Sequence, residues 1–161
     1  MPKSQQIAAL PWRMGEQGVE ILLVTTRTTK RWLIPKGWTM DGKADHEAAE
    51  IEAYEEAGVM GVANITSIGN YGYIKLSDSG KPRHLNVRVY ALEVKRVLGE
   101  WPERSERERI WVSPQQALTM IGEPELLPVI AAFHAPKSEA MPLPEGGFMN
   151  TLRGWLSRIF R

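Results

Sequence analysis

The chain has 161 residues, of which 43% are hydrophobic and 24% charged, and it contains no cysteine. This composition is typical of one soluble globular domain, and the lack of cysteine excludes thiol catalysis, cysteine-ligated zinc and a disulfide framework. A formal charge of +1 gives no global attraction to polyanions, so no nucleic-acid partner is expected. Because no secretory signal and no apolar run approaching ~20 residues is present, a cytoplasmic location is expected.

The first half of the chain is predicted to contain two strands, a loop and one long helix. The residues from Val19 to Thr26 are rich in β-branched side chains and predict a buried strand, and Arg31 to Pro35 predict a short second one. A glycine-containing loop from Gly37 to Lys43 leads into the helix. The helix is predicted from Ala44 to Ala57, because Ala and Glu dominate this stretch and Gly58 ends it.

The second half predicts more strands and two shorter helices. Leu85 to Val94 alternates strictly between apolar and polar residues, as a half-buried strand does. The other predicted elements are strands at Ile65 to Leu76 and Arg107 to Val112, a helix from Pro114 to Ile121 capped by Ser113, and a helix at Glu125 to Phe133. Strands and helices that alternate over one core predict an α/β or mixed sandwich.

The chain divides into three parts by composition. Residues 1–135 are predicted to form the domain, and residues 136–147, rich in Pro and Gly, to form a linker. Residues 148–161 carry apolar side chains at helical spacing with three arginines, which predicts a basic amphipathic helix. This helix is expected to dock on its own domain; pairing with a second subunit and weak binding to an anionic membrane surface are the alternatives.

Three glutamates gather on one face of the predicted long helix. Glu52, Glu55 and Glu56 stand at positions i, i+3 and i+4, so their side chains share a single turn. Such like charges repel unless a cation lies among them, and hard divalent ions favour carboxylate ligands. The spacing therefore indicates a metal site, with a solvated acidic face as the simpler alternative.

The residues around these glutamates resemble the signature of the Nudix hydrolase family. Matching positions from 37 to 59 are Gly37, Glu52, Glu55, Glu56, Gly58 and Val59. The resemblance extends more loosely over residues 5 to 134 and is closest to the branch that hydrolyses diphosphoinositol and diadenosine polyphosphates. It implies an α/β (α+β) fold, an α/β/α sandwich with a mixed sheet flanked by helices.

Two positions depart from the family's pattern. Lys43 stands where the family has its first glutamate, and Ile51 stands where it has arginine. An arginine at position 51 would lie four residues before Glu55 and could hold that carboxylate, whereas isoleucine has no donor. We expect Ile51 to pack with Ala44 and Ala48 against the sheet. These departures keep open a second function, a Nudix-fold binding module with weakened turnover.

The resemblance implies hydrolysis of phosphoanhydride bonds with Mg²⁺ or Mn²⁺. Glu52 and Glu56 are expected as the main metal ligands together with the carbonyl of Gly37, and Glu55 as a further ligand or the general base. All three glutamates are therefore candidate catalytic residues. Metals held by carboxylates suit this reaction, because they neutralise phosphate oxygens and position water.

A polyphosphate substrate requires cations opposite the acidic helix. The candidate substrate-binding residues are Arg27, Arg31, Lys36, Lys43, Arg83, His84, Arg88 and Arg109, together with Trp38 as a stacking or loop-covering side chain. Ordinary solvent exposure is the alternative for each cationic candidate, and packing on Pro35 is the alternative for Trp38. Arg107 and Arg109 also resemble a basic cluster, but Glu106 and Glu108 interleave with them and could neutralise it.

Diadenosine or diphosphoinositol polyphosphates are the favoured small-molecule substrates. The alternative enzyme function is a pyrophosphatase that acts on ADP-ribose or nucleoside triphosphates. Removal of RNA caps is a further alternative. Specificity lies in loops whose orientation the sequence does not reveal.

Overall fold

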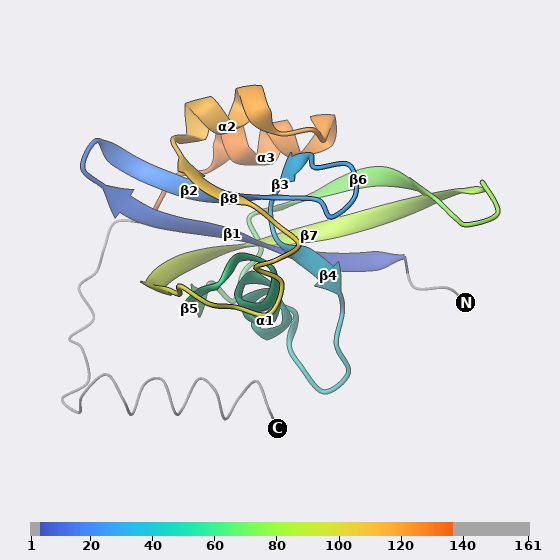
Figure 1. Ribbon diagram of the computed structural model, residues 1–161, viewed down its shortest axis with the longest axis horizontal. Coiled ribbons are helices and arrows are strands. Elements are labelled where there is room, and N and C mark those ends of the chain that lie inside the picture. The colour runs from blue at the N-terminus through green and yellow to red at the C-terminus, as the bar shows by residue number, and fades with distance from the viewer. Residues whose placement is uncertain (1–3, 137–161) are drawn as a thin grey trace.

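The structure is a computed structural model that describes residues 4–136. The predicted linker beyond Pro136 and the predicted helix at 148–161 lie outside these residues. One sheet lies between two helical layers, with α1 (Asp45–Ala57) on one face and α2 (Pro114–Met120) and α3 (Leu127–Ala132) on the other (Figure 1). This confirms the predicted α/β/α sandwich. None of the helices in this described part is long and apolar enough to span a membrane.

Within residues 4–136, eight strands form one mixed sheet. They are β1 (Gln5–Gly15), β2 (Gly18–Thr25), β3 (Trp32–Leu33), β4 (Lys36–Trp38), β5 (Val59–Ala63), β6 (Gly69–Leu76), β7 (Pro82–Val97) and β8 (Arg109–Val112). The main order is β3-β2-β1-β7-β5, while β4 pairs with β1, β6 with β7 and β8 with β2. The central pair β1 and β7 is parallel, and the other pairs are antiparallel.

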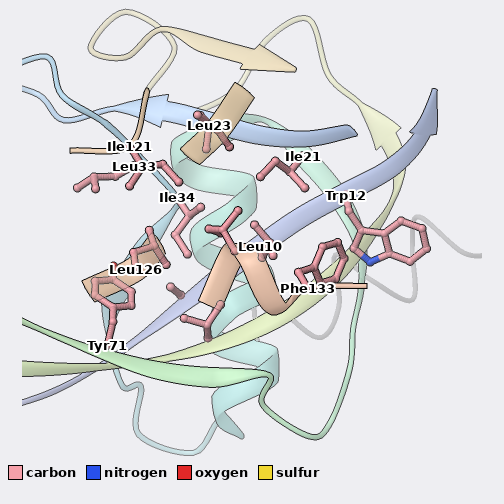
Figure 2. Close-up of a cluster of buried hydrophobic side chains, with 14 of the residues drawn as sticks. Leu10, Trp12, Ile21, Leu23, Leu33, Ile34, Tyr71, Ile121, Leu126 and Phe133 are labelled. Atoms are coloured by element: carbon pink, nitrogen blue, oxygen red, sulfur yellow. The ribbon is translucent and has the colours of Figure 1, made fainter. Parts of the chain in front are cut away.

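Each face of the sheet carries its own buried cluster, because side chains alternate across a strand. On the face of α2 and α3, Leu10 and Trp12 of β1 pack with Leu23 and Phe133 (Figure 2). On the opposite face, β1 and β2 pack against the small side chains of α1, namely Ala48, Ala49, Ala53 and Ala57. These alanines let α1 approach the sheet closely and place its other side at the sheet's edge.

Most of the predicted elements form, with shifted ends. The helix predicted at Glu125 to Phe133 begins as a 3₁₀ turn at Pro124–Leu126 before α3. The predicted loop at Gly37 to Lys43 begins inside strand β4. Ile51 is buried as expected, but Ala44 is exposed at the start of α1, so the expected packing between these two residues was wrong.

Strands β1 and β5 were not predicted. In β1, Pro11 has no N–H to donate to a neighbouring strand, which is unusual inside a sheet. The register explains how this proline fits: β4 pairs with β1 at residues 6–8 and β2 pairs with it at residues 12–15, so Pro11 falls between the two antiparallel partners. On its other side β1 pairs continuously with β7 from Gln5 to Trp12.

The end of α1 is fixed by Gly58 in the left-handed conformation. Gly58 has φ 64° and ψ 37°, and its N–H donates to the carbonyls of Ala53 and Tyr54. The indole ring of Trp101 covers this turn so closely that a Cβ on Gly58 would lie 2.5 Å from a ring carbon. Position 58 therefore needs glycine both for its backbone and for the space.

Replacing Gly58→Ala should destabilise the fold more than the same change at Gly42, which also has a positive φ (75°) but faces open space. The left-handed backbone costs about 1–2 kcal/mol at both positions. The overlap with Trp101 adds about 1–3 kcal/mol at Gly58 alone. Urea unfolding measures both variants, and equal losses would show that Trp101 does not constrain the turn.

Candidate active site

The last two turns of α1 carry the three predicted glutamates at the edge of the sheet. Glu56 is buried at 7% exposure, and Glu52 and Glu55 are partly buried. Gly37 of β4 lies directly against Glu52, because any side chain at position 37 would overlap the Glu52 carboxylate. The structure thus brings Gly37 to the acidic face, as the sequence predicted.

The segment between β7 and β8, residues 98–108, wraps around the C-terminal end of α1. A helix leaves its last carbonyls without partners, and here the wrapping segment and β8 supply them. The donors are the Glu103 amide to the Glu55 carbonyl (3.0 Å), the Trp101 indole to Glu56 (3.1 Å) and the Arg109 guanidinium to Ala57 (2.8 Å). These bonds fix the segment onto the turn that carries the glutamates.

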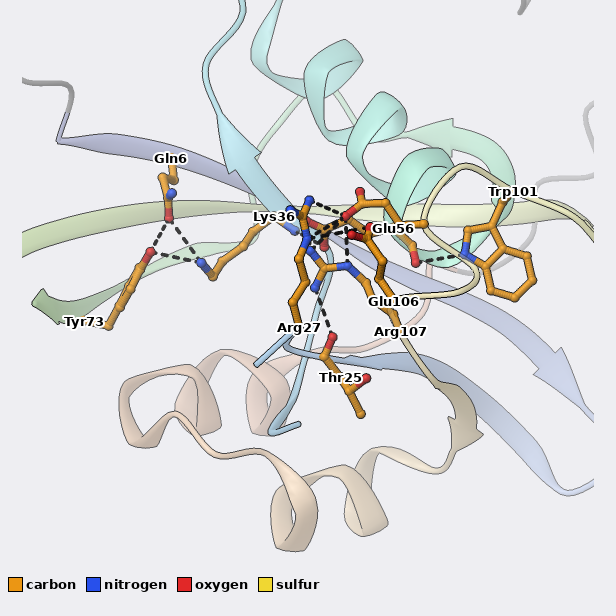
Figure 3. Close-up of polar contacts among 10 residues, drawn as sticks. Gln6, Thr25, Arg27, Lys36, Glu56, Tyr73, Trp101, Glu106 and Arg107 are labelled. Atoms are coloured by element: carbon orange, nitrogen blue, oxygen red, sulfur yellow. Dashed lines mark hydrogen bonds and ion pairs between the residues drawn. The ribbon is translucent and has the colours of Figure 1, made fainter. Parts of the chain in front are cut away.

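Arg107 places a guanidinium between two carboxylates at this end of the helix (Figure 3). Its Nη2 lies 3.3 Å from Oε1 of Glu56 and 3.1 Å from Oε1 of Glu103. Its Nη1 donates to the carbonyl of Thr25 in β2 at 3.0 Å. Arg27 reaches Glu103 from outside at 2.5 Å. The Arg107, Glu56 and Glu103 side chains are 11%, 9% and 13% exposed, so this network is nearly buried.

Lys36 connects the acidic face to an aromatic side of the site. Its backbone amide donates to Oε2 of Glu56 at 3.2 Å, so both carboxylate oxygens of Glu56 are held. Its ammonium donates to the hydroxyl of Tyr73 at 2.9 Å, and that hydroxyl donates to Gln6 at 2.6 Å (Figure 3). The two ends of Lys36 therefore order different halves of the site.

A cavity of about 630 Å³ opens beside Glu56. It is lined by the cations Arg27, Arg31, Lys36, Lys75 and Arg107, by Glu56 and Glu123, and by apolar and aromatic residues that include Leu33, Ile34, Tyr71, Tyr73, Ile74 and Leu76. A larger hollow of about 940 Å³ lies elsewhere, beside Trp12 and Phe133, but no predicted site residue lines it. The cavity beside Glu56 is therefore the candidate active site.

Tyr71 lines this cavity with an unused polar group. The side chain is 3% exposed, and its hydroxyl has no hydrogen-bond partner within residues 4–136. An unsatisfied buried hydroxyl costs stability, so such a group requires an explanation. Because the hydroxyl oxygen is itself buried, a molecule in the cavity would reach it only if neighbouring side chains moved.

The carboxylates are held in an environment that disfavours their charge. Burial raises the pKa of Glu52 to about 8, and the charges of Glu56, Glu55 and Glu103 add to this effect. Burial also raises the pKa of Glu56 to about 7, even though Arg107 acts in the opposite direction. Burial raises the pKa of Glu55 as well. The cluster thus has more negative charge than its neighbours neutralise.

The donor set fits a hard divalent cation. The carboxylates of Glu52, Glu55 and Glu56 supply oxygen ligands, and the lack of a side chain at Gly37 lets the Glu52 carboxylate lie directly against the backbone of β4. In the described part of the chain, no three acidic or histidine side chains converge closely enough to form a preformed metal cage.

Several other predicted substrate residues lie outside the cavity. Arg88 pairs with Asp45 at the start of α1 (3.0 Å), and the guanidinium of Arg83 lies 5.7 Å from the ring centre of Trp38. The predicted residues that do not line the cavity are Trp38, Lys43, Arg83, His84, Arg88 and Arg109. Arg27, Arg31 and Lys36 do line it.

Arg109 has a structural position. Its guanidinium donates to the carbonyls of Ala57 (2.8 Å), Gly58 (3.2 Å) and Leu98 (2.7 Å), and it stacks 3.9 Å from the ring centre of Trp101. These contacts place a positive charge at the negative end of α1. The structure therefore gives Arg109 the role of a helix cap, where the sequence predicted substrate binding.

Sequence reasoning did not select some residues that the fold brings to the site. Glu103 and Arg107 belong to a run of alternating charges, and only their contacts with α1 reveal their place. Tyr71, Tyr73 and Lys75 lie on β6, which β1 and β7 separate from β4, so only the folded sheet shows that these residues border the same cavity as Lys36. The alternating charge of residues 103–109 is the one sequence signal that pointed to this region.

Comparison with known proteins agrees with this geometry. The family model of the NUDIX domain matches residues 4–133. The chain therefore belongs to the Nudix hydrolase family, as the glutamate helix and its glycines predicted.

Among curated proteins, Nudix hydrolase 16, mitochondrial, from Arabidopsis thaliana is 34% identical over 109 residues, 66% of this chain and 60% of that protein. Diphosphoinositol polyphosphate phosphohydrolase 3-beta from Bos taurus is 26% identical over 119 residues, 73% of this chain and 68% of that protein. Three Arabidopsis relatives are matched over only 52% to 60% of their own length.

Solved structures share the fold at low identity. A C. elegans Ap4A hydrolase binary complex has a TM-score of 0.60 at 17% identity, covering 80% of this chain and 93% of that one. The NUDIX domain of Shewanella oneidensis NrtR, complexed with ADP ribose, has a TM-score of 0.61 at 13% identity, covering 81% and 88%. These likenesses show the fold alone.

Replacing Glu52→Gln should stabilise the metal-free protein at high pH. The pKa of Glu52 in the folded protein lies above its ordinary value of 4.5. The protonated Glu52 side chain therefore contributes fully to stability below pH 4.5, and this contribution is lost as the pH rises towards 8. Gln carries no charge, and we expect a gain on the order of 2 kcal/mol at about pH 8 and little gain near pH 4.5. Urea unfolding in EDTA measures this difference.

Glu47→Gln is the matched control, because Glu47 lies in the first turn of the same helix. A negative charge there is favourable to the helix dipole, so its removal brings no gain. A pH-independent effect of Glu52→Gln would contradict the assigned electrostatics.

Proposed function

We propose that this chain is a divalent-metal-dependent pyrophosphohydrolase that cleaves phosphoanhydride bonds of polyphosphorylated small molecules. The observation that carries the proposal is that a surface of carboxylates lies next to a cavity lined by cations. Glu52, Glu55 and Glu56 of α1 form an acidic face, and Glu56 opens onto a cavity that contains five cationic side chains. Carboxylates that hold a metal and cations that hold phosphates are the two parts that hydrolysis of a polyphosphate requires.

The chain's own residues divide the work of the reaction. Arg31, Lys36 and Lys75 bind non-bridging phosphate oxygens in the cavity. Water adds to a phosphorus atom while the bridging P–O bond breaks, and a carboxylate of the cluster accepts the proton from this water. Glu55 is the favoured base, because Glu56 is already held on both oxygens. Mg²⁺ or Mn²⁺, when bound by Glu52, Glu56 and the Gly37 carbonyl, supplies positive charge to the developing oxyanion.

Diadenosine or diphosphoinositol polyphosphates are the favoured substrates. Two relatives carry these activities in their names, the Bos taurus phosphohydrolase and the C. elegans Ap4A hydrolase. The cavity supports a substrate with several phosphates, since Arg27 and Arg31 of the β2–β3 connection and Lys75 of β6 reach it from two different segments. ADP-ribose and nucleoside triphosphates are the alternative substrates, and binding without turnover is the alternative function suggested by Lys43 and Ile51.

The experiment is release of phosphate or nucleotide from diadenosine polyphosphates, diphosphoinositol polyphosphates, ADP-ribose and nucleoside triphosphates with Mg²⁺ or Mn²⁺. Glu56→Gln should lower turnover by at least about 100-fold, because it removes the most buried carboxylate of the cluster. Glu47→Gln should leave turnover unchanged. Tight binding of these compounds without any hydrolysis would show that the chain is a binding module and not an enzyme. If the chain neither binds nor hydrolyses any of them, both proposals are overturned.

Tyr71→Phe should separate substrate binding from folding. The hydroxyl has no partner in the described residues, so its removal should leave the free energy of unfolding equal or raise it by about 1 kcal/mol. If the hydroxyl donates to bound substrate, KM should rise by about 3- to 10-fold. Tyr73→Phe is the contrast, because it breaks the bonds to Lys36 and Gln6 and should lower stability. An unchanged KM in Tyr71→Phe would contradict the contact.

A further inference from the structure

The acidic helix contains no cation of its own. Across Asp45–Ala57 there are six acidic residues and no lysine or arginine. Position 51, where an arginine would lie one turn from Glu55, is an isoleucine at 6% exposure. Any positive charge that orders these carboxylates must therefore come from another part of the fold.

Arg107 supplies this charge to one of them, Glu56. It lies just before β8, 51 residues after Glu56, and it is held on three sides. Nη1 is anchored on the Thr25 carbonyl at 3.0 Å, Nε and Nη2 lie 3.2 and 3.1 Å from Oε1 of Glu103, and Nη2 lies 3.3 Å from Oε1 of Glu56. Because several of its N–H donors are engaged at once, the guanidinium of Arg107 is held in one orientation.

The effect on Glu56 is to fix the direction of its carboxylate. Arg107 holds Oε1, the Lys36 amide holds Oε2, and the Trp101 indole holds the backbone carbonyl of the same residue. Because Glu56 and Arg107 are 9% and 11% exposed, water screens their attraction weakly. Breaking a buried pair by removing one partner leaves the other charge uncompensated.

We propose that Arg107 is a positioning residue that holds Glu56 ready to bind the divalent ion, so that a cation from outside α1 orders this carboxylate. This inference rests on the proposed function. It assigns Arg107 no contact with the reacting atoms. Its alternatives are an arginine that only fastens residues 98–108 to β2, and an arginine that competes with the ion for Glu56.

Mn²⁺ binding in the absence of substrate, followed by electron paramagnetic resonance, distinguishes these possibilities. Arg107→Ala should weaken Mn²⁺ binding by about 10- to 100-fold, the usual effect of losing a group that orients a ligand. Arg107→Lys should recover part of this loss, since an ammonium restores the charge without the fork of donors. For hydrolysis, kcat should fall more than KM rises.

Arg104→Ala is the matched control, because Arg104 lies on the same segment and pairs with the exposed Glu100. It should leave Mn²⁺ binding within about twofold, as expected for an exposed ion pair. Circular dichroism and thermal unfolding at the working temperature establish that each variant is folded, and Arg107→Lys carries the test if the alanine variant is not.

The outcomes are separable. Native-like Mn²⁺ binding in folded Arg107→Ala or Arg107→Lys would overturn the positioning role while leaving the proposed function intact. Tighter binding would overturn it in favour of competition. A native chain that binds Mn²⁺ but hydrolyses no anhydride would refute the proposed enzyme and leave the role of Arg107 in ion binding to be decided by the same variants. A native chain that binds no Mn²⁺ would overturn both.

Discussion

The whole site depends on neutralising the negative end of one helix. The C-terminal end of α1 combines the partial negative charge of carbonyls that have no partner within the helix with the carboxylates of Glu52, Glu55 and Glu56, whose charge has the same sign when they ionise. The helix itself supplies no lysine or arginine. Residues 98–109 supply both hydrogen-bond donors and positive charge. The Glu103 amide and the Trp101 indole donate to the last carbonyls of α1, while Arg107 and Arg109 bring positive charge.

The two arginines serve this end of the helix in different ways. Arg109 is turned towards the backbone and the Trp101 ring, and its charge acts on carbonyls. Arg107 is turned towards the carboxylates of Glu56 and Glu103 and borders the cavity. Arg109 is the first residue of β8 whereas Arg107 lies two residues before the strand, and each meets a different group. The identity of each arginine's partner is a property of the fold.

The sequence predicted what depends on local spacing. The register of Glu52, Glu55 and Glu56, the glycine at 58 and the alternation around Val87 all follow from periods along the chain, and the structure contains these elements. It did not predict β1, because Pro11 interrupts the usual strand pattern and only the pairing of two partners on one edge accommodates it. The roles of Arg107, Arg109 and Glu103 were missed for a related reason. Each is defined by a contact with a residue about 50 positions away.

The wrapping of residues 98–108 around α1 has a consequence for the order of folding. The helix and the strand β5 that follows it are close in sequence and can form early, but the contacts of Arg107 with Thr25 and Glu56 close loops of 82 and 51 residues. Closing such loops costs entropy that local contacts do not. During synthesis, the acidic turn of α1 therefore stays without its cations until β8 has emerged. Assembly of the site therefore depends on long-range closures like the one that joins β1 to β7 in the sheet.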